Sequence, residues 1–409
     1  PPRPEHPARL RARQDEILLE STMSTPRKQA QNLARTLFNS DHQMFRDSVR
    51  RFFETEIMPN HERWEEQGYV DRDAWLKAGQ NGFLCATMPE QFGGAGVDRL
   101  YSTILIEEAA RAGASGPGFS LHSDIVSNYL LNFGTEAQKQ AYLPAMARGE
   151  KIGAIAMTEP GAGSDLQSIR TTAKREGDEY VINGSKTYIT NGYNADLIVL
   201  VAKTNPELGA KGTSLLLVEA GDAGFAKGKR LKKLGLKAQD TSELFFDNVR
   251  VPADRLLGKE GEGFIYLMKE LPWERLMIAI RAVANAEAAI EWTLEYVKNR
   301  KAFGKTVFDF QSARFKLAEL KTEVQVGRVF VDRCIESVLK GELDTATASM
   351  AKLWCTEMQG KVIDECVQLH GGSGFMLEYP ITRAYADARV QRIFGGTSEI
   401  MKEVISRTL

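Results

Sequence analysis

The sequence has no long apolar run and no surplus of charge of either sign. The most apolar stretch, residues 195–202, is far shorter than the roughly 20 residues that a membrane-spanning helix needs. Lys+Arg 53 and Asp+Glu 54 nearly balance, so no basic excess indicates a nucleic acid or an anionic membrane as the main partner. We therefore predict a globular protein with no membrane span and no nucleic-acid partner.

Cysteine and histidine are both scarce. The four cysteines show no paired metal spacing, and the 5 histidines form neither His-x-x-x-His nor His-Glu-x-x-His. We predict no metal site and reduced, buried cysteines of the cytosolic type. Residues 1–22 mix four acids with four arginines and lack an apolar core, which argues against a secretory signal or a transit peptide. The predicted location is the cytoplasm of a bacterial-type cell, with the mitochondrial matrix as the less favoured alternative.

Nucleotide-binding glycine motifs are also missing. Gly304-Lys305-Thr306 resembles the end of a Walker loop, but Asn299 stands where its first glycine is required. No Gly-x-Gly-x-x-Gly opens a helix after a strand, so a Rossmann domain is not supported.

Three regions differ in their apolar pattern. From about residue 41 to 149 the pattern is helical, with helices expected near 45–53, 102–112 and 135–147. From about 150 to 252 short strands alternate with turn residues, at 180–190, 197–201, 214–218 and 244–251. Asn183-Gly184 predicts a hairpin turn within the first of these, and the set predicts a small antiparallel barrel or sandwich.

The last region is helical again. No proline occurs between Pro272 and Pro380, and apolar residues there recur at steps of three, four and seven. This predicts long amphipathic helices with the periodicity of a bundle. The chain is therefore expected to run α, then β, then α.

Two short segments could bind a polar ligand. Residues 157–165, Met-Thr-Glu-Pro-Gly-Ala-Gly-Ser-Asp, offer the hydroxyls of Thr158 and Ser164 and backbone N–H groups that could cradle a pyrophosphate. Tyr188 and Thr190 add an aromatic face and a hydroxyl. Taken alone, the first segment is more often a plain surface turn, and the second is ordinary strand alternation.

Together with three further motifs, these segments resemble the acyl-CoA dehydrogenases. The motifs are Thr158–Asp165, Tyr188-Ile-Thr-Asn191, Arg300-Lys-Ala-Phe-Gly304, Gln368-Leu-His-Gly-Gly372 and Gly396-Thr-Ser398. They follow the order and spacing of the family from about Asp41 to the C-terminus. Leu271-Pro-Trp-Glu-Arg275 and Phe394-Gly-Gly396 are most similar to the long-chain branch.

The resemblance implies an α+β fold of three domains. These are an N-terminal helical domain (41–150), a middle β-barrel (151–255) and a C-terminal four-helix bundle (256–409), assembled as a homotetramer. Residues 1–40 would be an N-terminal extension, partly disordered.

The resemblance also implies FAD, bound between the middle domain and the bundle. One group of residues would line the flavin of the same chain: Met157, Thr158, Gly163, Ser164, Tyr188, Ile189, Thr190, Thr397 and Glu399. A second group would reach the FAD of a neighbouring subunit: Arg300, Phe303, Gln311, Gln368, Gly371 and Gly372. Arg300 would lie on the pyrophosphate, because a guanidinium fork pairs well with phosphate oxygens.

The chemistry implied is α,β-dehydrogenation of a saturated acyl-CoA, in which a carboxylate removes the α-proton. Many family members carry this base just before Gly-Thr-Ser, where this sequence has Gly395. The long-chain and isovaleryl branches carry it in the helix with Glu-Arg-Leu, and we predict Glu274 as the catalytic base. Ser164, Arg275, Gly395 and Gly396 would contact the substrate. The alternative for Glu274 is an ordinary first-turn acid of a helix that Pro272 starts.

The expected function is therefore FAD-dependent oxidation of a medium- to long-chain acyl-CoA to the trans-2-enoyl-CoA, as in fatty-acid β-oxidation. Electrons would pass to an electron-transfer flavoprotein. The alternatives are an isovaleryl or other branched-chain acyl-CoA dehydrogenase, an oxidase that uses O₂, and an inactive paralogue that serves as a binding subunit.

Overall fold

The protein is represented by a computed structural model in which residues 33–409 are described. Most of the predicted extension 1–40 therefore lies outside the described residues. Residues 37–409 form one unit.

Its first part is helical, as predicted. Asn39 accepts a hydrogen bond from the backbone N–H of His42 and so caps the first helix, and Thr135 caps the last one in the same way. The elements are α2 (Ser40–Phe52), η1 (Phe53–Ile57), α3 (Met58–Gln67), α4 (Arg72–Gln80), η2 (Glu90–Phe92), α5 (Arg99–Ala112), α6 (Phe119–Leu121), η3 (His122–Val126), α7 (Ser127–Phe133) and α8 (Glu136–Ala147).

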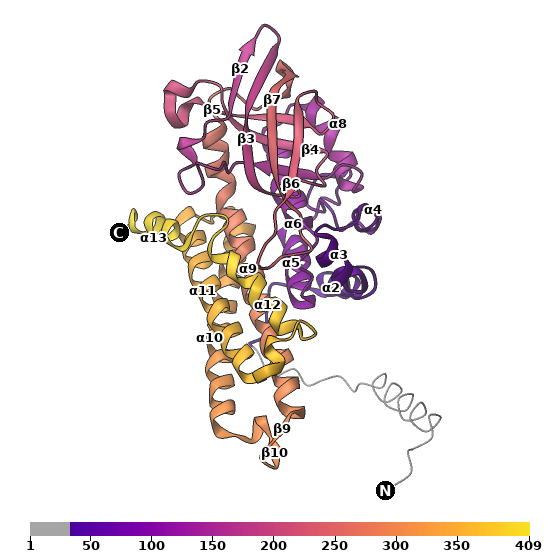
Figure 1. Ribbon diagram of the computed structural model, residues 1–409, viewed down its shortest axis with the longest axis vertical. Helices are drawn as coiled ribbons and strands as arrows, with labels where there is room; N and C mark the ends of the chain where they lie inside the picture. The colour runs from indigo at the N-terminus through magenta and orange to yellow at the C-terminus, as the bar shows by residue number, and fades with distance from the viewer. Residues whose placement is uncertain (1–32) are drawn as a thin grey trace. The chain divides into compact units, whose positions relative to one another are not determined.

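The middle part is one eight-stranded sheet in the order β6-β7-β3-β2-β4-β5-β8, with β1 paired to β4 (Figure 1). It is mixed rather than purely antiparallel, because β1 and β2 both pair with β4 in parallel. The main strands are β1 (Gly153–Ala156), β2 (Thr172–Glu176), β3 (Glu179–Thr190), β4 (Leu197–Lys203), β5 (Thr213–Glu219), β6 (Phe225–Arg230), β7 (Thr241–Pro252) and β8 (Leu256–Leu257).

The prediction of a hairpin turn at Asn183-Gly184 is wrong. Strand β3 runs through both residues, and its pairing with β7 shifts register between Ile182 and Gly184. Gly184 has φ 150°, and a Cβ there would lie 2.4 Å from Thr171 Oγ1. The glycine therefore serves a bulge and a close approach of two backbones.

The last part contains the predicted long helices. They are α9 (Gly263–Asn299), α10 (Gln311–Leu339) and α11 (Thr345–His370), followed by α12 (Pro380–Ala388) and α13 (Ser398–Ser406). A small hairpin of β9 (Lys301–Ala302) and β10 (Lys305–Thr306) joins α9 to α10. Figure 1 shows this hairpin at the end of the bundle opposite the sheet. The sequence prediction of α, then β, then α is confirmed.

Pro272 does not start a helix, contrary to the sequence expectation. It lies inside α9, which begins at Gly263 and already buries Tyr266 and Leu267 before the proline. A proline inside a helix removes one backbone hydrogen bond, and burial on both sides of it outweighs that loss. Glu274 is consequently an interior residue of α9, so the alternative that it is a first-turn acid fails.

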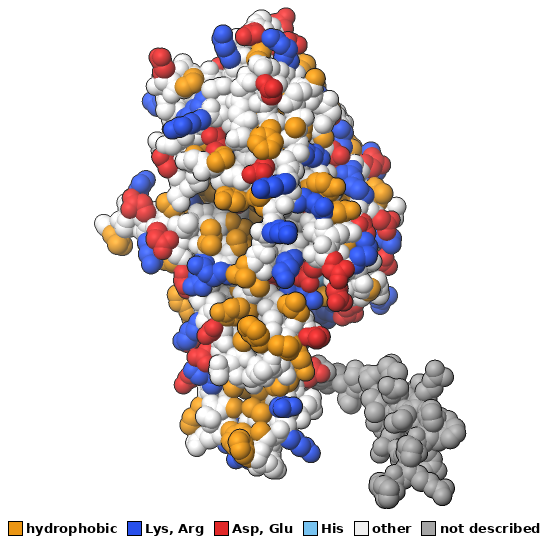
Figure 2. All heavy atoms as spheres, viewed as in Figure 1, with side chains coloured by type: hydrophobic (Ala, Val, Ile, Leu, Met, Phe, Trp, Pro, Cys, Tyr) orange, Lys and Arg blue, Asp and Glu red, His pale blue; other side chains and the backbone are white. Residues whose placement is uncertain are grey.

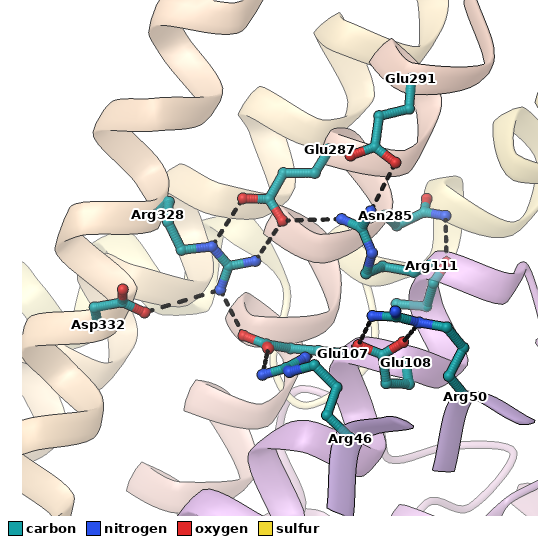
Figure 3. A network of polar contacts seen from close by, with 11 residues as sticks. Arg46, Arg50, Glu107, Glu108, Arg111, Asn285, Glu287, Glu291, Arg328 and Asp332 are labelled. Carbon is teal, nitrogen blue, oxygen red and sulfur yellow. Dashed lines mark hydrogen bonds and ion pairs between the residues drawn. The ribbon is translucent and has the colours of Figure 1, made fainter. Parts of the chain in front are cut away.

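A buried ion-pair network joins the N-terminal helices to the bundle (Figure 3). Glu107 on α5 accepts hydrogen bonds from Arg46 Nη2 at 2.9 Å and from Arg328 Nη1 at 2.7 Å. Arg328 on α10 also holds Glu287 on α9 through two hydrogen bonds, at 2.9 and 2.8 Å. Because Arg328 and Glu107 are almost fully buried, the network fixes α5, α9 and α10 against one another.

Four further properties concern the whole described chain. No helix in residues 33–409 is both long and apolar enough to cross a membrane, and no cluster of metal-ligating side chains occurs among these residues. All four cysteines are free and buried, as predicted. Burial raises the pKa of the Cys355 thiol above its ordinary value.

Replacing Arg328 with Met should lower the free energy of unfolding by about 3–5 kcal/mol, since it removes the cation that joins Glu107 to Glu287 and leaves the buried Glu107 with the charge of Arg46 as its remaining ion pair. Urea unfolding followed by circular dichroism measures this change. The matched control is Arg333→Met on the same helix, whose exposed pair with Glu336 should contribute less than about 1 kcal/mol. Equal losses in both variants would contradict a role for the network.

Candidate active site

Glu274 is buried in the contact between α9 and α7. Its side chain is 8% exposed, and Tyr129 Oη donates a hydrogen bond to Glu274 Oε1 at 3.0 Å. Tyr129 lies on α7, on the helical run that starts with α6. The N-terminal helices and the bundle therefore meet at this carboxyl group.

Burial shifts the pKa of Glu274 from its ordinary value to about 7. Removal from water is the main cause, because it penalises the charged form. The charge of Glu270 raises the pKa further, whereas the hydrogen bond from Tyr129 and the charge of Arg275 lower it. A carboxyl with a pKa near 7 can both accept and release a proton at neutral pH, as a general base must.

Gly395 packs against α9, the helix that carries Glu274. It has φ 63°, and a Cβ there would come within 2.7 Å of Ile278 Cδ1, one turn after Glu274. The two positions at which the sequence suggested a catalytic base are thus neighbours in space. Only one of them, Glu274, carries a carboxylate.

A buried cation holds the segment after Gly395. Lys352 Nζ on α11 donates to the carbonyl oxygen of Gly396 at 2.6 Å, and burial lowers the pKa of Lys352 to about 8. Arg275 Nη1 donates to Ser349 Oγ on α11 at 3.1 Å, while its Nε has no hydrogen-bond partner among the described residues. Lys352 therefore orders the segment, and Arg275 joins α9 to α11.

The loop at residues 157–165, which is predicted to bind a polar ligand, is anchored by buried polar contacts. The buried carboxylate of Glu159 accepts from the backbone N–H groups of Arg170 at 2.6 Å and Thr171 at 2.9 Å, and from Lys186 Nζ at 2.8 Å. Lys186 also donates to the carbonyl oxygen of Met157 at 2.9 Å. These contacts fix the ends of the loop, and Gly163 near its tip has open space around its Cα.

Strand β3 presents the two predicted ligand-facing residues beside this loop. The backbone N–H of Thr187 donates to the carbonyl oxygen of Thr158 at 2.9 Å, so the loop and the strand end lie together. Tyr188 has φ 59° and is 68% exposed, and Thr190 is partly exposed. The side chain of Ile189 is buried in the sheet, which leaves only its backbone for a ligand.

The residues predicted to reach a neighbouring subunit lie elsewhere. Arg300 follows the last residue of α9, 26 positions after Glu274, which corresponds to about 39 Å along the helix. Phe303, in the turn that follows, is 94% exposed. All six members of this group are exposed: Arg300, Phe303, Gln311, Gln368, Gly371 and Gly372. A single chain therefore does not bring them together with the loop and Tyr188.

The C-terminal motif residues surround the start of α13. Thr397 caps that helix by accepting from the backbone N–H of Ile400 at 3.3 Å. Ser164 and Glu399 are exposed, and contacts at the helix start lower the pKa of Glu399.

His370 is buried and stacked on Tyr296 with ring centroids 4.4 Å apart, so it is a packed residue rather than a second base.

Four residues of the site were not found from the sequence: Tyr129, Glu159, Lys186 and Lys352. Glu159 falls inside a recognised motif, but its inward direction is a property of the fold. Lys352 carried a weak signal, because it shares the buried stripe of α11 with Ala348 and Cys355. Nothing in the sequence indicated that Tyr129 would contact Glu274.

Three family models match the chain, and together they span most of it. They describe the N-terminal domain of acyl-CoA dehydrogenase over residues 39–150, its middle domain over 154–249 and its C-terminal domain over 261–409. The chain is 55% identical, over 377 residues, to the mitochondrial long-chain specific acyl-CoA dehydrogenase of Rattus norvegicus. That match covers 92% of this chain and 88% of the rat protein.

Solved structures agree with these matches. An acyl-CoA dehydrogenase from Geobacillus kaustophilus superposes with a TM-score of 0.90 at 50% identity, covering 92% of this chain and 99% of that one. A glutaryl-CoA dehydrogenase from Mycobacterium smegmatis in complex with FADH2 superposes with a TM-score of 0.84 at 29% identity, covering 91% and 95%.

The pKa of Glu274 predicts a pH-dependent effect of Glu274→Gln on stability. The folded protein holds the proton up to about pH 7, whereas the unfolded chain releases it near 4.5. Folding of the wild type is therefore penalised increasingly as pH rises from about 4.5 to 7. The glutamine variant lacks this penalty and keeps the hydrogen bond from Tyr129.

At pH 8 the variant should be more stable than the wild type by about 3 kcal/mol, and at pH 4 the two should be equal. Urea unfolding at both pH values measures the difference. A constant difference across pH would show that Glu274 titrates normally.

Proposed function

The chain belongs to the acyl-CoA dehydrogenase family, and from this premise we propose that Glu274 is the base of a FAD-dependent enzyme that oxidises medium- to long-chain acyl-CoA thioesters. The enzyme is an oxidoreductase that dehydrogenates acyl-CoA, and its cofactor is FAD. The assignment of the base rests on the buried carboxyl of Glu274, which has a pKa of about 7. The neighbouring position that carries the base in other family members is Gly395 here and has no carboxylate.

The residues of the middle domain fit a flavin. Tyr188 offers an exposed aromatic face, against which a flat ring can pack. Thr158, Ser164 and Thr190 bring hydroxyls to the same region. The anchored loop with open space at Gly163 suits the close approach of a phosphate to backbone N–H groups. We propose Met157 and the backbone of Ile189 as further contacts, and Thr397 and Glu399 at the edge of the ring system.

In the proposed reaction Glu274 removes the proton from the α-carbon of the thioester. Bound FAD supplies the acceptor for the hydride that leaves the β-carbon. The proton goes to a Glu274 oxygen, and Tyr129 Oη, bound to Oε1, holds the carboxylate in a fixed orientation. Because the carboxyl is shielded from water, its basicity matches the task at neutral pH.

The glycines at 395 and 396 would contact the thioester end of the substrate. Gly395 packs closely against Ile278, where a Cβ would lie 2.7 Å from Ile278 Cδ1, and its backbone N–H can polarise a thioester carbonyl. Lys352 fixes the Gly396 carbonyl, which holds the segment in place. We propose Arg275, whose side chain lies close to Gly396, as a further contact of the substrate.

A homotetramer would complete the cofactor site. The hairpin of β9 and β10 lies at the end of the bundle opposite the sheet (Figure 1). Arg300 directly precedes β9 and Phe303 lies between the two strands, so their proposed contacts with FAD require a second chain. Apolar side chains also gather on the bundle surface (Figure 2). Strongly exposed examples are Phe303, Phe315 and Phe375, and a patch of this kind is typical of a protein–protein contact.

The proposed chain-length class rests on sequence identity. The similarity to the rat long-chain enzyme extends over nearly the whole chain. A branched-chain substrate is the alternative, because the same base position occurs in the isovaleryl branch. An inactive paralogue is disfavoured by the presence and environment of Glu274.

We further propose an electron-transfer flavoprotein as the acceptor, rather than O₂. The compartment remains the sequence prediction of a cytoplasmic enzyme, which the four free, buried cysteines support. The rat relative is described as mitochondrial, so the matrix is the alternative.

Glu274→Gln should reduce turnover of acyl-CoA by about 10²–10⁴-fold while the protein still binds FAD, because only the proton acceptor is lost. Steady-state rates with an artificial electron acceptor and the visible flavin spectrum measure the two properties. Glu295→Gln, an exposed change on the same helix, is the control and should retain full activity. Substantial activity in Glu274→Gln would sink the assignment of the base.

Tyr129→Phe removes the hydrogen bond that lowers the pKa of Glu274. The acidic limb of the pH profile of kcat/KM should therefore move from about pH 7 to higher pH, while the rate at high pH changes less. An unshifted limb would mean that another group sets the profile.

Anaerobic titration of the purified holoprotein with acyl-CoAs from butyryl to palmitoyl tests the substrate class. We expect the flavin absorbance to bleach most readily with medium and long chains. Bleaching by isovaleryl-CoA alone would favour the branched-chain alternative, and failure of every thioester to bleach bound flavin would favour the inactive paralogue.

A further inference from the structure

A cavity of about 70 Å³ lies where α5, the α6–η3 run, α9, α11 and α12 meet. Part of its wall is apolar and includes Phe53, Phe83 and Leu105. Another part is polar and includes Arg281, Gln359 and Gln391. A cavity with this mixed lining differs from a purely apolar tunnel.

The cavity continues the face of α9 that carries the base. Glu274, Ile278, Arg281 and Asn285 stand at intervals of four, three and four residues, so their side chains follow one stripe of the helix. Arg281 lies about 10 Å beyond Glu274 along the axis. A substrate whose α-carbon lies at Glu274 and whose chain follows this stripe would therefore end in the cavity.

Arg281 has few partners for a charged group in an enclosed position. Its Nη2 donates to Ser120 Oγ at 3.0 Å, and it forms no ion pair with any residue of the described chain. The carboxylate whose charge acts on Arg281 is Asp387. Burial raises the pKa of Asp387 itself. Guanidinium N–H groups that face an enclosed cavity without an acceptor are costly.

Two acceptors on the same wall also lack partners. Gln359 Oε1 and Gln391 Oε1 are buried and have no hydrogen bond within residues 33–409. Gln359 is oriented by its Nε2, which donates to Asn285 Oδ1 at 2.9 Å. The cavity therefore brings together the guanidinium of Arg281, which donates to Ser120, and two buried acceptors that lack partners.

We propose that this cavity receives the distal end of the acyl chain and that the enzyme accepts acyl-CoAs bearing a hydroxyl group there. A hydroxyl accepts a hydrogen bond from Arg281 and donates one to a glutamine oxygen, so it satisfies both kinds of group. A carboxylate accepts only and would face Asp387, and a methyl end satisfies neither. The inference rests on the proposed function, because it assumes that the acyl chain follows α9.

Binding to the Glu274→Gln holoprotein tests this, because the chemical step is blocked there. Isothermal titration compares decanoyl-CoA with 10-hydroxydecanoyl-CoA and dodecanoyl-CoA with 12-hydroxydodecanoyl-CoA. At least one hydroxylated thioester should bind about tenfold more tightly than its parent. Adding Arg281→Met should abolish the preference, and Gln359→Met provides an independent second variant. Arg333→Met, on the surface, should leave the preference intact.

The proposal is overturned if neither hydroxylated chain binds more tightly than its parent, which would mean that the cavity holds only water. It is also overturned if the preference survives both Arg281→Met and Gln359→Met, or if the mono-CoA ester of dodecanedioic acid binds more tightly than the hydroxylated chain. Failure of the proposed function is seen separately, as wild-type flavin that dodecanoyl-CoA does not bleach.

Discussion

The position of α9 is the constraint on which the rest of the structure depends. This one helix carries Glu274, the neighbour of Gly395 at Ile278, the cavity residue Arg281 and the network residue Glu287. Arg328 holds α9 to α10 and to α5 through charge-assisted hydrogen bonds. Breaking a buried set of this kind leaves unpaired charges, so the network fixes one packing of the N-terminal helices on the bundle. That packing places Tyr129 against Glu274.

Placing the base on α9 also explains the glycine at 395. A second carboxylate at that position would lie beside Ile278, one turn from Glu274, and a neighbouring carboxylate raises the pKa of a carboxyl group. Glu270 already raises the pKa of Glu274 through its charge. A carboxylate at position 395 would therefore raise the pKa of Glu274 further, and in this chain Gly395 adds none.

The sequence predicted the architecture well where local pattern determines it. Apolar periodicity located α2, α5, α8, α9 and α10, and alternation with turn residues located β3, β4, β5 and β7. It failed at Asn183-Gly184, where the same dipeptide serves a bulge because β7 continues to pair across it. It also failed at Pro272, where packing on both sides extends the helix through the proline. Both errors arise because tertiary contacts override a local preference.

The residues of the site divide in the same way, into those that the sequence identified and those that depend on tertiary contacts. Glu274 and Gly395 were found by resemblance to a family, and the structure adds that they are neighbours. Tyr129 and Lys352 act through contacts between segments distant in sequence. No local pattern encodes such contacts, and the cavity at Arg281 likewise draws its wall from segments far apart in the sequence, from Phe53 to Gln391. What the sequence could not supply was the environment that turns an ordinary glutamate into a base.

That environment can be measured directly by infrared spectroscopy. The carboxyl stretching band of Glu274, isolated as the difference between the wild type and Glu274→Gln, is followed as a function of pH. The account predicts a protonated carboxyl at pH 6 that ionises with a midpoint near 7. A carboxylate already ionised at pH 5.5 would contradict the claim that burial between α7 and α9 creates the base.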